Sequence, residues 1–146
     1  MDTFPNLVSI GYEGRSVDEL VETLRAQGVS CLVDVRLTPI SRKAGMSKTA
    51  LERALHAAGI EYVHHRDLGN PKDNRDGYRA GHASSFDRYQ RVLTTAAGRD
   101  ALRHVSELLD GGAVALLCFE RDHAQCHRHQ VAEELAELRT LRLVCV

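Results

Sequence analysis

Short apolar runs alternate with amphipathic segments along the chain, and this alternation limits the fold more than any other feature of the sequence. Each run is continuous rather than alternating in polarity, which is typical of strands that are buried on both faces, as in a parallel sheet. We therefore predict strands at residues 7–11, 31–36, 60–65, 113–118 and 141–146.

The segments between these strands carry signals for helices. Ser16 and Glu19 have the spacing of a capping box, and Gly28 supplies a C-terminal stop for the same helix. The strands and helices in alternation predict a single three-layer α/β domain over residues 1–146, with a mostly parallel sheet of about five strands and helices on both faces. The helices are expected at 16–28, 47–59, about 85–95, 99–109 and about 126–138.

Length and composition agree with one globular domain. A chain of 146 residues with 43% hydrophobic residues is long enough to bury its own core. A net charge of -1 excludes a globally basic nucleic-acid binder but not a local basic patch. The sequence shows neither a membrane-spanning apolar stretch nor a signal peptide. We expect a cytoplasmic protein with no membrane partner, and the oligomeric state stays open.

The segment 66–84 differs from the rest of the chain, because it has no periodicity and is rich in turn-forming residues. Long irregular segments within compact domains are usually functional or disordered. We therefore predict a functional or flexible loop here. Whether it acts as a lid is left open.

Polar side chains follow the predicted strands at their carboxyl ends, which is the edge where open parallel sheets bind ligands. The segment after the second strand is basic, and cations beside hydroxyl groups suit phosphate or another anion. Asp34 needs a partner, since an unpaired buried carboxylate is very costly. It either orients Arg36 or caps a nearby loop. The anion-binding candidates are Arg15, Arg36, Ser41, Arg42, Lys43, His127 and Arg128.

The segment 115–130, "ALLCFERDHAQCHRHQ", holds the densest group of reactive side chains. Cys126 is predicted at or just before a helix start, where the helix N-terminus and the neighbouring cations favour its thiolate. Such a thiolate suits a nucleophile, and Glu120 is then the candidate general acid or base. The catalytic candidates are Glu120, Cys126, Tyr12 and Cys118.

The same segment offers zinc ligands in Cys118, His123, Cys126 and His127. Their spacing lacks the paired arrangement of familiar structural zinc sites, and two adjacent residues on a helix face different directions. No cofactor is therefore predicted, and zinc or another divalent metal is the alternative. The other two cysteines, Cys31 and Cys145, lie in apolar runs and are expected to be buried thiols. A reducing compartment would keep all four cysteines free.

The chain resembles the family known as domain of unknown function 488. The resemblance rests on "IGYEGRS", "LVDVRLTPISRK", "YVHHRDLGNP" and "CFERDHAQCHRHQVAEEL" and extends over essentially the whole chain. The family implies no established reaction. Its characteristic residues fall on Tyr12, Arg15, Asp34, Arg36, Ser41, Leu68, Gly69, Cys118, Glu120, Cys126, His127 and Arg128.

These observations favour an enzyme that acts on a phosphorylated small molecule, a nucleotide or a nucleic acid. Its site would lie at the carboxyl edge of the sheet, and the class of reaction, hydrolase or transferase, stays open. One alternative is a non-enzymatic module that binds nucleotides or nucleic acid. The other is a metal-binding protein that uses the cluster around Cys118 and Cys126.

Overall fold

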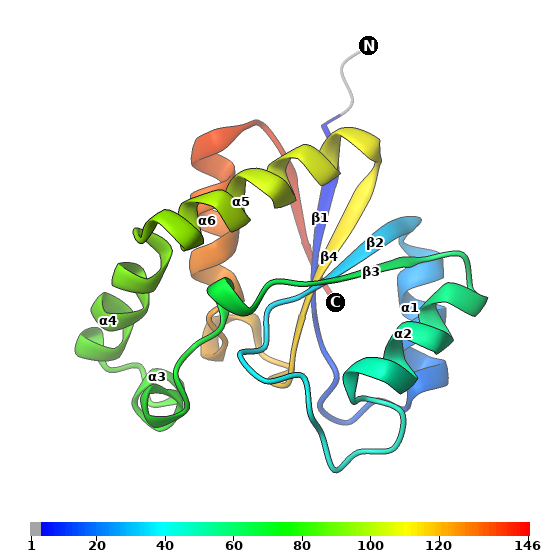
Figure 1. Cartoon of the computed structure of the whole chain (residues 1–146), viewed down its shortest axis with the longest axis horizontal. Coiled ribbons are helices and arrows are strands. Elements are labelled where there is room, and N and C mark those ends of the chain that lie inside the picture. The colour runs from blue at the N-terminus through cyan, green and yellow to red at the C-terminus, as the bar shows by residue number, and fades with distance from the viewer. Residues whose placement is uncertain (1–3) are drawn as a thin grey trace.

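A computed structural model describes residues 4–146, which contain a five-stranded sheet in which all strand pairs are parallel (Figure 1). The strand order is β3-β2-β4-β1-β5. The predicted α/β fold is confirmed. The strands are β1 (Asn6–Gly11), β2 (Val29–Asp34), β3 (Glu61–His64), β4 (Ala113–Cys118) and β5 (Arg142–Cys145).

Helices cover both faces of this sheet (Figure 1). The first two helices lie against one face, and the last three form the layer on the other. Within residues 4–146 the α-helices are α1 (Val17–Ala26), α2 (Lys48–Ala57), α3 (Arg75–Arg79), α4 (Ala83–Leu93), α5 (Ala96–Leu108) and α6 (Arg128–Leu138). Short 3-10 turns lie at η1 (Arg66–Leu68), η2 (Lys72–Asn74), η3 (Leu109–Gly111) and η4 (His123–Gln125).

Strand β4 explains why the strands read as continuous apolar runs. Its side chains alternate between two cores, because successive residues of a strand point to opposite faces. Val114 and Leu116 pack in the core beneath α5 and α6, whereas Ala115 and Leu117 pack in the core beneath α1 and α2. Both sets are fully buried, so neither face of this strand tolerates a polar residue.

The topological switch point of the sheet lies between β1 and β4, which are parallel neighbours. After β1 it continues into α1 on one face, and after β4 it continues into α6 on the other face (Figure 1). The loops that follow the two strands therefore diverge. Such a switch point is where open parallel sheets bind their ligands.

The segment 66–84, predicted as a loop, contains η1, η2, α3 and the first two residues of α4. These turns are too short to produce a periodic pattern in the sequence. Buried side chains hold them in place. Leu68 and Tyr78 are buried, and Asn74 donates to the side-chain oxygen of Asn70 and to the carbonyl of Ser85.

The observed helices agree with the predicted ones in their caps more closely than in their bounds. The capping box at Ser16 and Glu19 is present in both directions, as predicted. The helices predicted at about 85–95 and 99–109 each begin two or three residues earlier. None of the helices within residues 4–146 has both the length and the apolar character needed to cross a membrane.

Gly69 follows η1 at a point where two loops touch. A Cβ atom at this position would lie 2.4 Å from the Cα atom and 2.6 Å from the amide nitrogen of Leu37. We expect Gly69→Ala to lower the free energy of unfolding by about 1–3 kcal/mol, because backbone atoms cannot move aside as a flexible side chain does. Urea unfolding measures the loss.

The matched control is Gly111→Ala, since a Cβ atom at Gly111 meets nothing within 4 Å. This control is expected to unfold within about 0.5 kcal/mol of the wild type. Equal stability of the two variants would contradict the close packing of Gly69 against Leu37.

Candidate functional site

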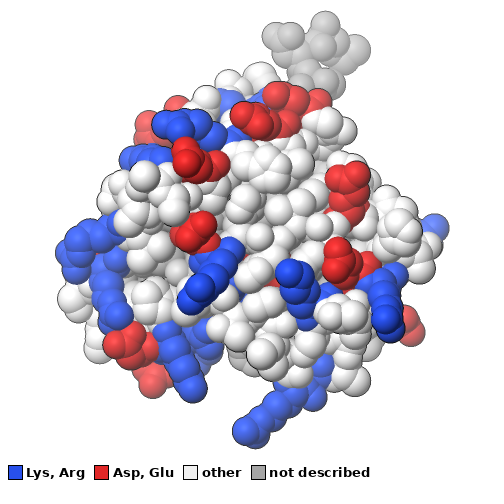
Figure 2. All heavy atoms as spheres, viewed as in Figure 1, with Lys and Arg blue, Asp and Glu red and all other residues white. Residues whose placement is uncertain are grey.

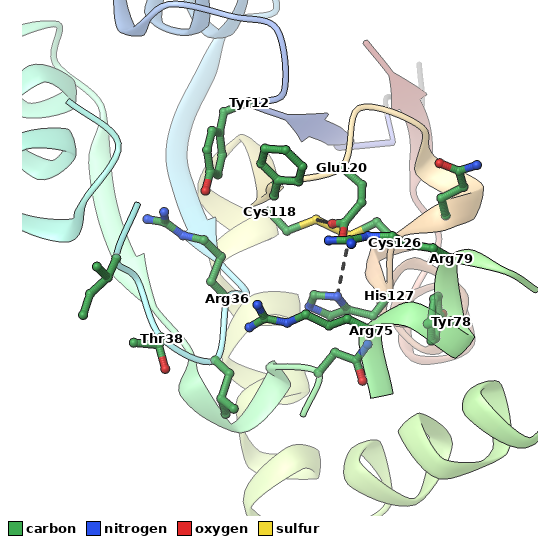
Figure 3. A pocket seen from close by; sticks show the side chains of 15 residues that line it. Tyr12, Arg36, Thr38, Arg75, Tyr78, Arg79, Cys118, Glu120, Cys126 and His127 are labelled. Carbon is green, nitrogen blue, oxygen red and sulfur yellow. Dashed lines mark hydrogen bonds and ion pairs between the residues drawn. A yellow bond between two sulfur atoms is a disulfide. The ribbon is translucent and has the colours of Figure 1, made fainter. Parts of the chain in front are cut away.

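A pocket opens at the carboxyl ends of β1, β2 and β4, and α3 forms its opposite wall (Figure 3). Its volume is about 70 Å³, which is room for a few water molecules or one group the size of a phosphate. The strand ends supply Tyr12, Arg36, Cys118 and Glu120 to its lining. Cys126 and His127 also line it, so the pocket brings together six of the predicted site residues.

Asp34, the last residue of β2, is fully buried and pairs with Arg36. Its Oδ2 atom lies 2.6 Å from Nη2 of Arg36 and also accepts from the hydroxyl of Tyr62 at 2.6 Å. The backbone amide of Arg36 donates to Oδ1 at 3.1 Å. The strand therefore ends two residues earlier than predicted, and the chain turns so that Arg36 folds back onto its carboxylate.

The guanidinium of Arg36 is held on several sides. Nη1 donates to the carbonyl of Met46 at 2.8 Å, and the group lies 5.4 Å from the ring centroid of Tyr12. Burial pushes its pKa down, but the bonded Asp34 carboxylate more than offsets this, so the pKa of Arg36 lies above its ordinary value. Arg36 is a fixed, permanently charged part of the pocket wall.

Helix α3 contributes two further arginines, Arg75 and Arg79, which the sequence analysis missed. Arg79 donates from Nε to Oε1 of Glu120 at 2.9 Å, and its Nη2 lies 2.8 Å from the same oxygen. Arg75 lines the pocket and takes part in no side-chain hydrogen bond or ion pair among residues 4–146. Figure 3 shows its guanidinium beside His127, inside the pocket. The basic character of "NRDGYR" was the available signal.

His127 is buried in the wall of the pocket between these groups. Its Nε2 atom lies 2.8 Å from the carbonyl oxygen of Val35, so that nitrogen carries the proton and donates. Burial lowers the pKa of His127 to about 4, which leaves the ring neutral at physiological pH. Its Nδ1 atom therefore carries a lone pair, and it lies 3.6 Å from Sγ of Cys126.

Cys118 and Cys126 are joined as a disulfide in this structure, which corrects the expectation of four free thiols. The Oε2 atom of Glu120 lies 3.4 Å from Sγ of Cys118. The other two cysteines are unpaired. Cys31 is buried, as predicted, and burial raises its pKa to about 11. Cys145 was predicted to be buried but is exposed, because β5 lies at the edge of the sheet.

Helix α6 begins at Arg128, two residues after the start predicted at about residue 126, and Cys126 lies just before the helix. Cys126 has an extended backbone (φ -117°, ψ 144°), and His127 is the residue before the first turn of the helix. This break in the backbone lets two adjacent side chains face the same pocket. In a continuous helix the two side chains would point about 100° apart, as the prediction against a shared metal site required.

Other predicted site residues lie outside the pocket lining. Arg15 is buried and donates to the carbonyl of Gly11 at 3.1 Å and to the hydroxyl of Thr23 at 3.3 Å. Lys43 has its Nζ atom 3.5 Å from the carbonyl oxygen of Tyr12. Ser41 and Arg42, in the same loop as Lys43, do not line the pocket either.

Arg128 is fully buried outside the lining and donates to the backbone carbonyl of Glu120. Within the described chain its Nε and Nη1 atoms have no hydrogen-bond partner. Burial lowers its pKa to about 10. A Cβ atom at Gly11 would lie only 1.8 Å from the same carbonyl oxygen, so no side chain fits at this position. Arg128 and Gly11 thus set the path of the loop that carries Glu120.

His123, the fourth metal-ligand candidate, points away from the two cysteines. Its Nδ1 atom lies 2.6 Å from the hydroxyl oxygen of Ser9 on β1. The described residues contain one group of cysteine and histidine side chains close enough to hold a metal ion, and this group consists of Cys118, Cys126 and His127.

Replacing Asp34 tests how much its ion pair with Arg36 contributes to the stability of the pocket wall. We expect Asp34→Asn to lower the free energy of unfolding by about 3–5 kcal/mol, because it leaves the buried Arg36 without a counterion. Tyr62→Phe removes one hydrogen bond from the same carboxylate but keeps the ion pair, and is expected to cost about 1.5 kcal/mol. Urea unfolding measures the free energy of unfolding of both variants. An equal loss in Tyr62→Phe and Asp34→Asn would contradict the role of the ion pair.

The family comparison agrees with the resemblance seen in the sequence. The model described as "Domain of unknown function DUF488" matches residues 16–135, a span that includes the loops after β2 and β4 and the helix α3. Comparison with curated proteins and with solved structures found no match. The match covers most of the chain, and this protein therefore belongs to the family of domains of unknown function DUF488.

Proposed function

We propose that this protein is an enzyme that acts on a phosphorylated small molecule or nucleotide, with the phosphate held in the pocket of Figure 3. The observation that carries the proposal is Arg75. Its guanidinium lines a narrow pocket and has no carboxylate partner among residues 4–146. A partly enclosed arginine without a counterion favours an anionic ligand, because such a ligand supplies the missing charge and paired hydrogen bonds.

The mouth of the pocket supports a ligand with an organic part. Phe119 and Ile40 line the pocket and are 41% and 73% exposed, which is unusual for large apolar side chains. Phe119 packs edge-on against Tyr12, with ring centroids 5.3 Å apart. A sugar or base joined to the phosphate would cover these two side chains, since the cavity itself is too small for a whole nucleotide.

Glu120 is the group best suited to move a proton in this pocket. One carboxylate oxygen is fixed by Arg79, and the other faces Cys118 on the pocket side. A carboxylate held in a fixed position beside a bound phosphoester can act as general base or acid. Tyr12 lines the same wall and supplies a hydroxyl group.

The charge pattern on the face shown in Figure 2 supports a small ligand over an extended nucleic acid. On the face shown in Figure 2, Lys and Arg side chains are interspersed with Asp and Glu side chains. Nucleic-acid binding without sequence preference relies on a continuous basic surface. The interspersed charges favour recognition inside the pocket.

Replacing Arg75 tests the anion site. We expect Arg75→Ala to weaken the binding of inorganic phosphate and of adenosine 5′-monophosphate by about tenfold or more, since a charge-assisted hydrogen bond is lost. Isothermal titration at fixed ionic strength measures both constants. Arg75 makes no ion pair, so this variant is expected to keep the stability of the wild type.

The matched control is Arg53→Ala, which removes the same charge from an exposed position on α2, outside the pocket. A second variant, Arg42→Ala, removes an exposed cation from the basic loop. Equal weakening in Arg75→Ala and Arg53→Ala would mean that binding depends on net charge alone. A loss found in Arg42→Ala and not in Arg75→Ala would move the anion site to the basic loop.

Replacing Glu120 separates an enzyme from a binding module. We expect Glu120→Gln to lower turnover by about a hundredfold or more while ligand affinity changes little, because the amide cannot take up a proton. Release of phosphate or base from a panel of nucleotides and sugar phosphates, followed by chromatography, measures turnover. Glu133→Gln, exposed on α6, is the control. A wild type that binds these ligands and converts none of them would favour a non-enzymatic module.

A further inference from the structure

One wall of the pocket brings together three side chains that are good ligands for a soft metal ion. The Sγ atoms of Cys118 and Cys126 and a ring nitrogen of His127 all lie within 4.8 Å of one another. All three residues are buried. They come from the end of β4 and from the two residues that precede α6, so the switch point of the sheet assembles the cluster.

The orientation of His127 is that of a metal ligand. Its Nε2–H donates to the carbonyl oxygen of Val35 at 2.8 Å, and its Nδ1 atom faces Sγ of Cys126 at 3.6 Å. Histidines that bind metal ions almost always donate their second ring nitrogen to a carbonyl or a carboxylate, which fixes both the tautomer and the ring orientation. That outer contact is already in place here.

The two cysteines are placed for a shared ion as well as for a disulfide. Their Cα atoms are 7.5 Å apart, whereas most disulfides join Cα atoms separated by roughly 4.4–6.8 Å. Two thiolates that bind one zinc ion do not need their sulfur atoms in contact. The reduced pair can therefore hold an ion without a change in the path of the backbone.

Charge also favours the ion. Two thiolates and one Zn²⁺ ion sum to zero, and neutral His127 adds no charge, so a buried cluster carries little desolvation cost. Glu120 is already balanced by Arg79. Thiolate and imidazole ligands together select zinc over magnesium or calcium, which prefer oxygen ligands.

From these contacts we propose that Cys118, Cys126 and His127, in the dithiol form of the protein, bind a zinc ion. All three residues line the pocket, so a fourth ligand would come from the pocket side, near the carboxylate of Glu120. Three protein ligands and one open position are typical of catalytic zinc, which activates a water molecule or polarises an oxygen of the substrate. His123, a member of the alternative zinc set considered from the sequence, has no part in the site because it faces Ser9.

The disulfide is then the oxidised, metal-free form of the same pair. Oxidised glutathione takes two electrons from the two thiolates and is itself reduced to two glutathione thiolates, which take up two protons from water. The Cys118–Cys126 bond forms, the glutathione S–S bond breaks, and the zinc ion is released because both sulfur ligands are used. Zinc binding and disulfide formation therefore exclude each other at this site.

The test is the zinc content of untagged protein purified without chelator, in the presence of a phosphine reductant. Inductively coupled plasma mass spectrometry measures zinc against sulfur, for which four cysteines and two methionines are the internal standard. We expect about one zinc ion per chain in the wild type. Cys126→Ser and His127→Gln are expected to retain almost none.

Two controls match these variants. Cys145→Ser removes an exposed thiol, and His123→Gln removes the histidine that faces Ser9; both are expected to keep the zinc of the wild type. Retention of zinc in Cys126→Ser would overturn the proposal. Loss of zinc in His123→Gln together with its retention in His127→Gln would overturn it equally.

A second measurement uses the wild type alone, in case a ligand variant fails to fold. Cobalt(II) added to the reduced, metal-free protein is expected to give the intense visible bands of tetrahedral cobalt and a thiolate charge-transfer band. Oxidised glutathione is expected to remove both. A reduced wild type that takes up neither zinc nor cobalt would overturn the proposal.

The zinc site shares a wall with the proposed phosphate site but does not depend on it. Metal content is measured without any substrate, and phosphate binding by Arg75 is measured with or without zinc. Absence of zinc with normal phosphate binding would reject the metal site alone. Bound zinc without phosphate binding would reject the anion site alone.

Discussion

The buried pair of Asp34 and Arg36 is the interaction on which the pocket depends. It joins the end of β2 to the loop that follows, because Nη1 of Arg36 reaches the carbonyl of Met46. It also joins the edge strand β3, since Tyr62 donates to Asp34 and His64 donates to the carbonyl of Arg36 at 2.7 Å. Breaking such a pair leaves a charge inside the protein, so the three segments are expected to move as one unit.

The opposite half of the pocket is fixed to the ends of β2 and β1 by contacts with their backbone. His127 bonds to the carbonyl of Val35, the residue between Asp34 and Arg36. The loop that carries Glu120 passes so close to Gly11 that no side chain fits between them. The buried Arg128 donates a hydrogen bond to the backbone carbonyl of Glu120. The reactive groups thus sit on loops, yet each loop is tied to the rigid sheet, as preorganised binding sites require.

Periodicity predicted the five strands and the five longer helices, because β4 and its neighbours are buried on both faces and their runs are unambiguous, but it missed α3. The site was predicted in part. Glu120, Cys118 and His127 were placed by the rule that strand ends meet, whereas Arg75 and Arg79 lie on a helix of five residues that leaves no pattern. Arg15 and Arg128 could not be separated from ligand-binding arginines, since sequence does not reveal which cations are used to hold loops.

The break between Cys126 and α6 has a consequence for how this domain can vary. Each residue of an α-helix turns the following side chain by about 100°. Inserting or deleting one residue between Cys118 and Arg128 would rotate His127 away from the two sulfur atoms or carry it into the helix. The length of this connection is therefore under the same constraint as its chemistry. Relatives that keep the cluster should tolerate exchanges at the exposed residues Arg121 and Ala124, which do not line the pocket, far better than any change in the number of residues.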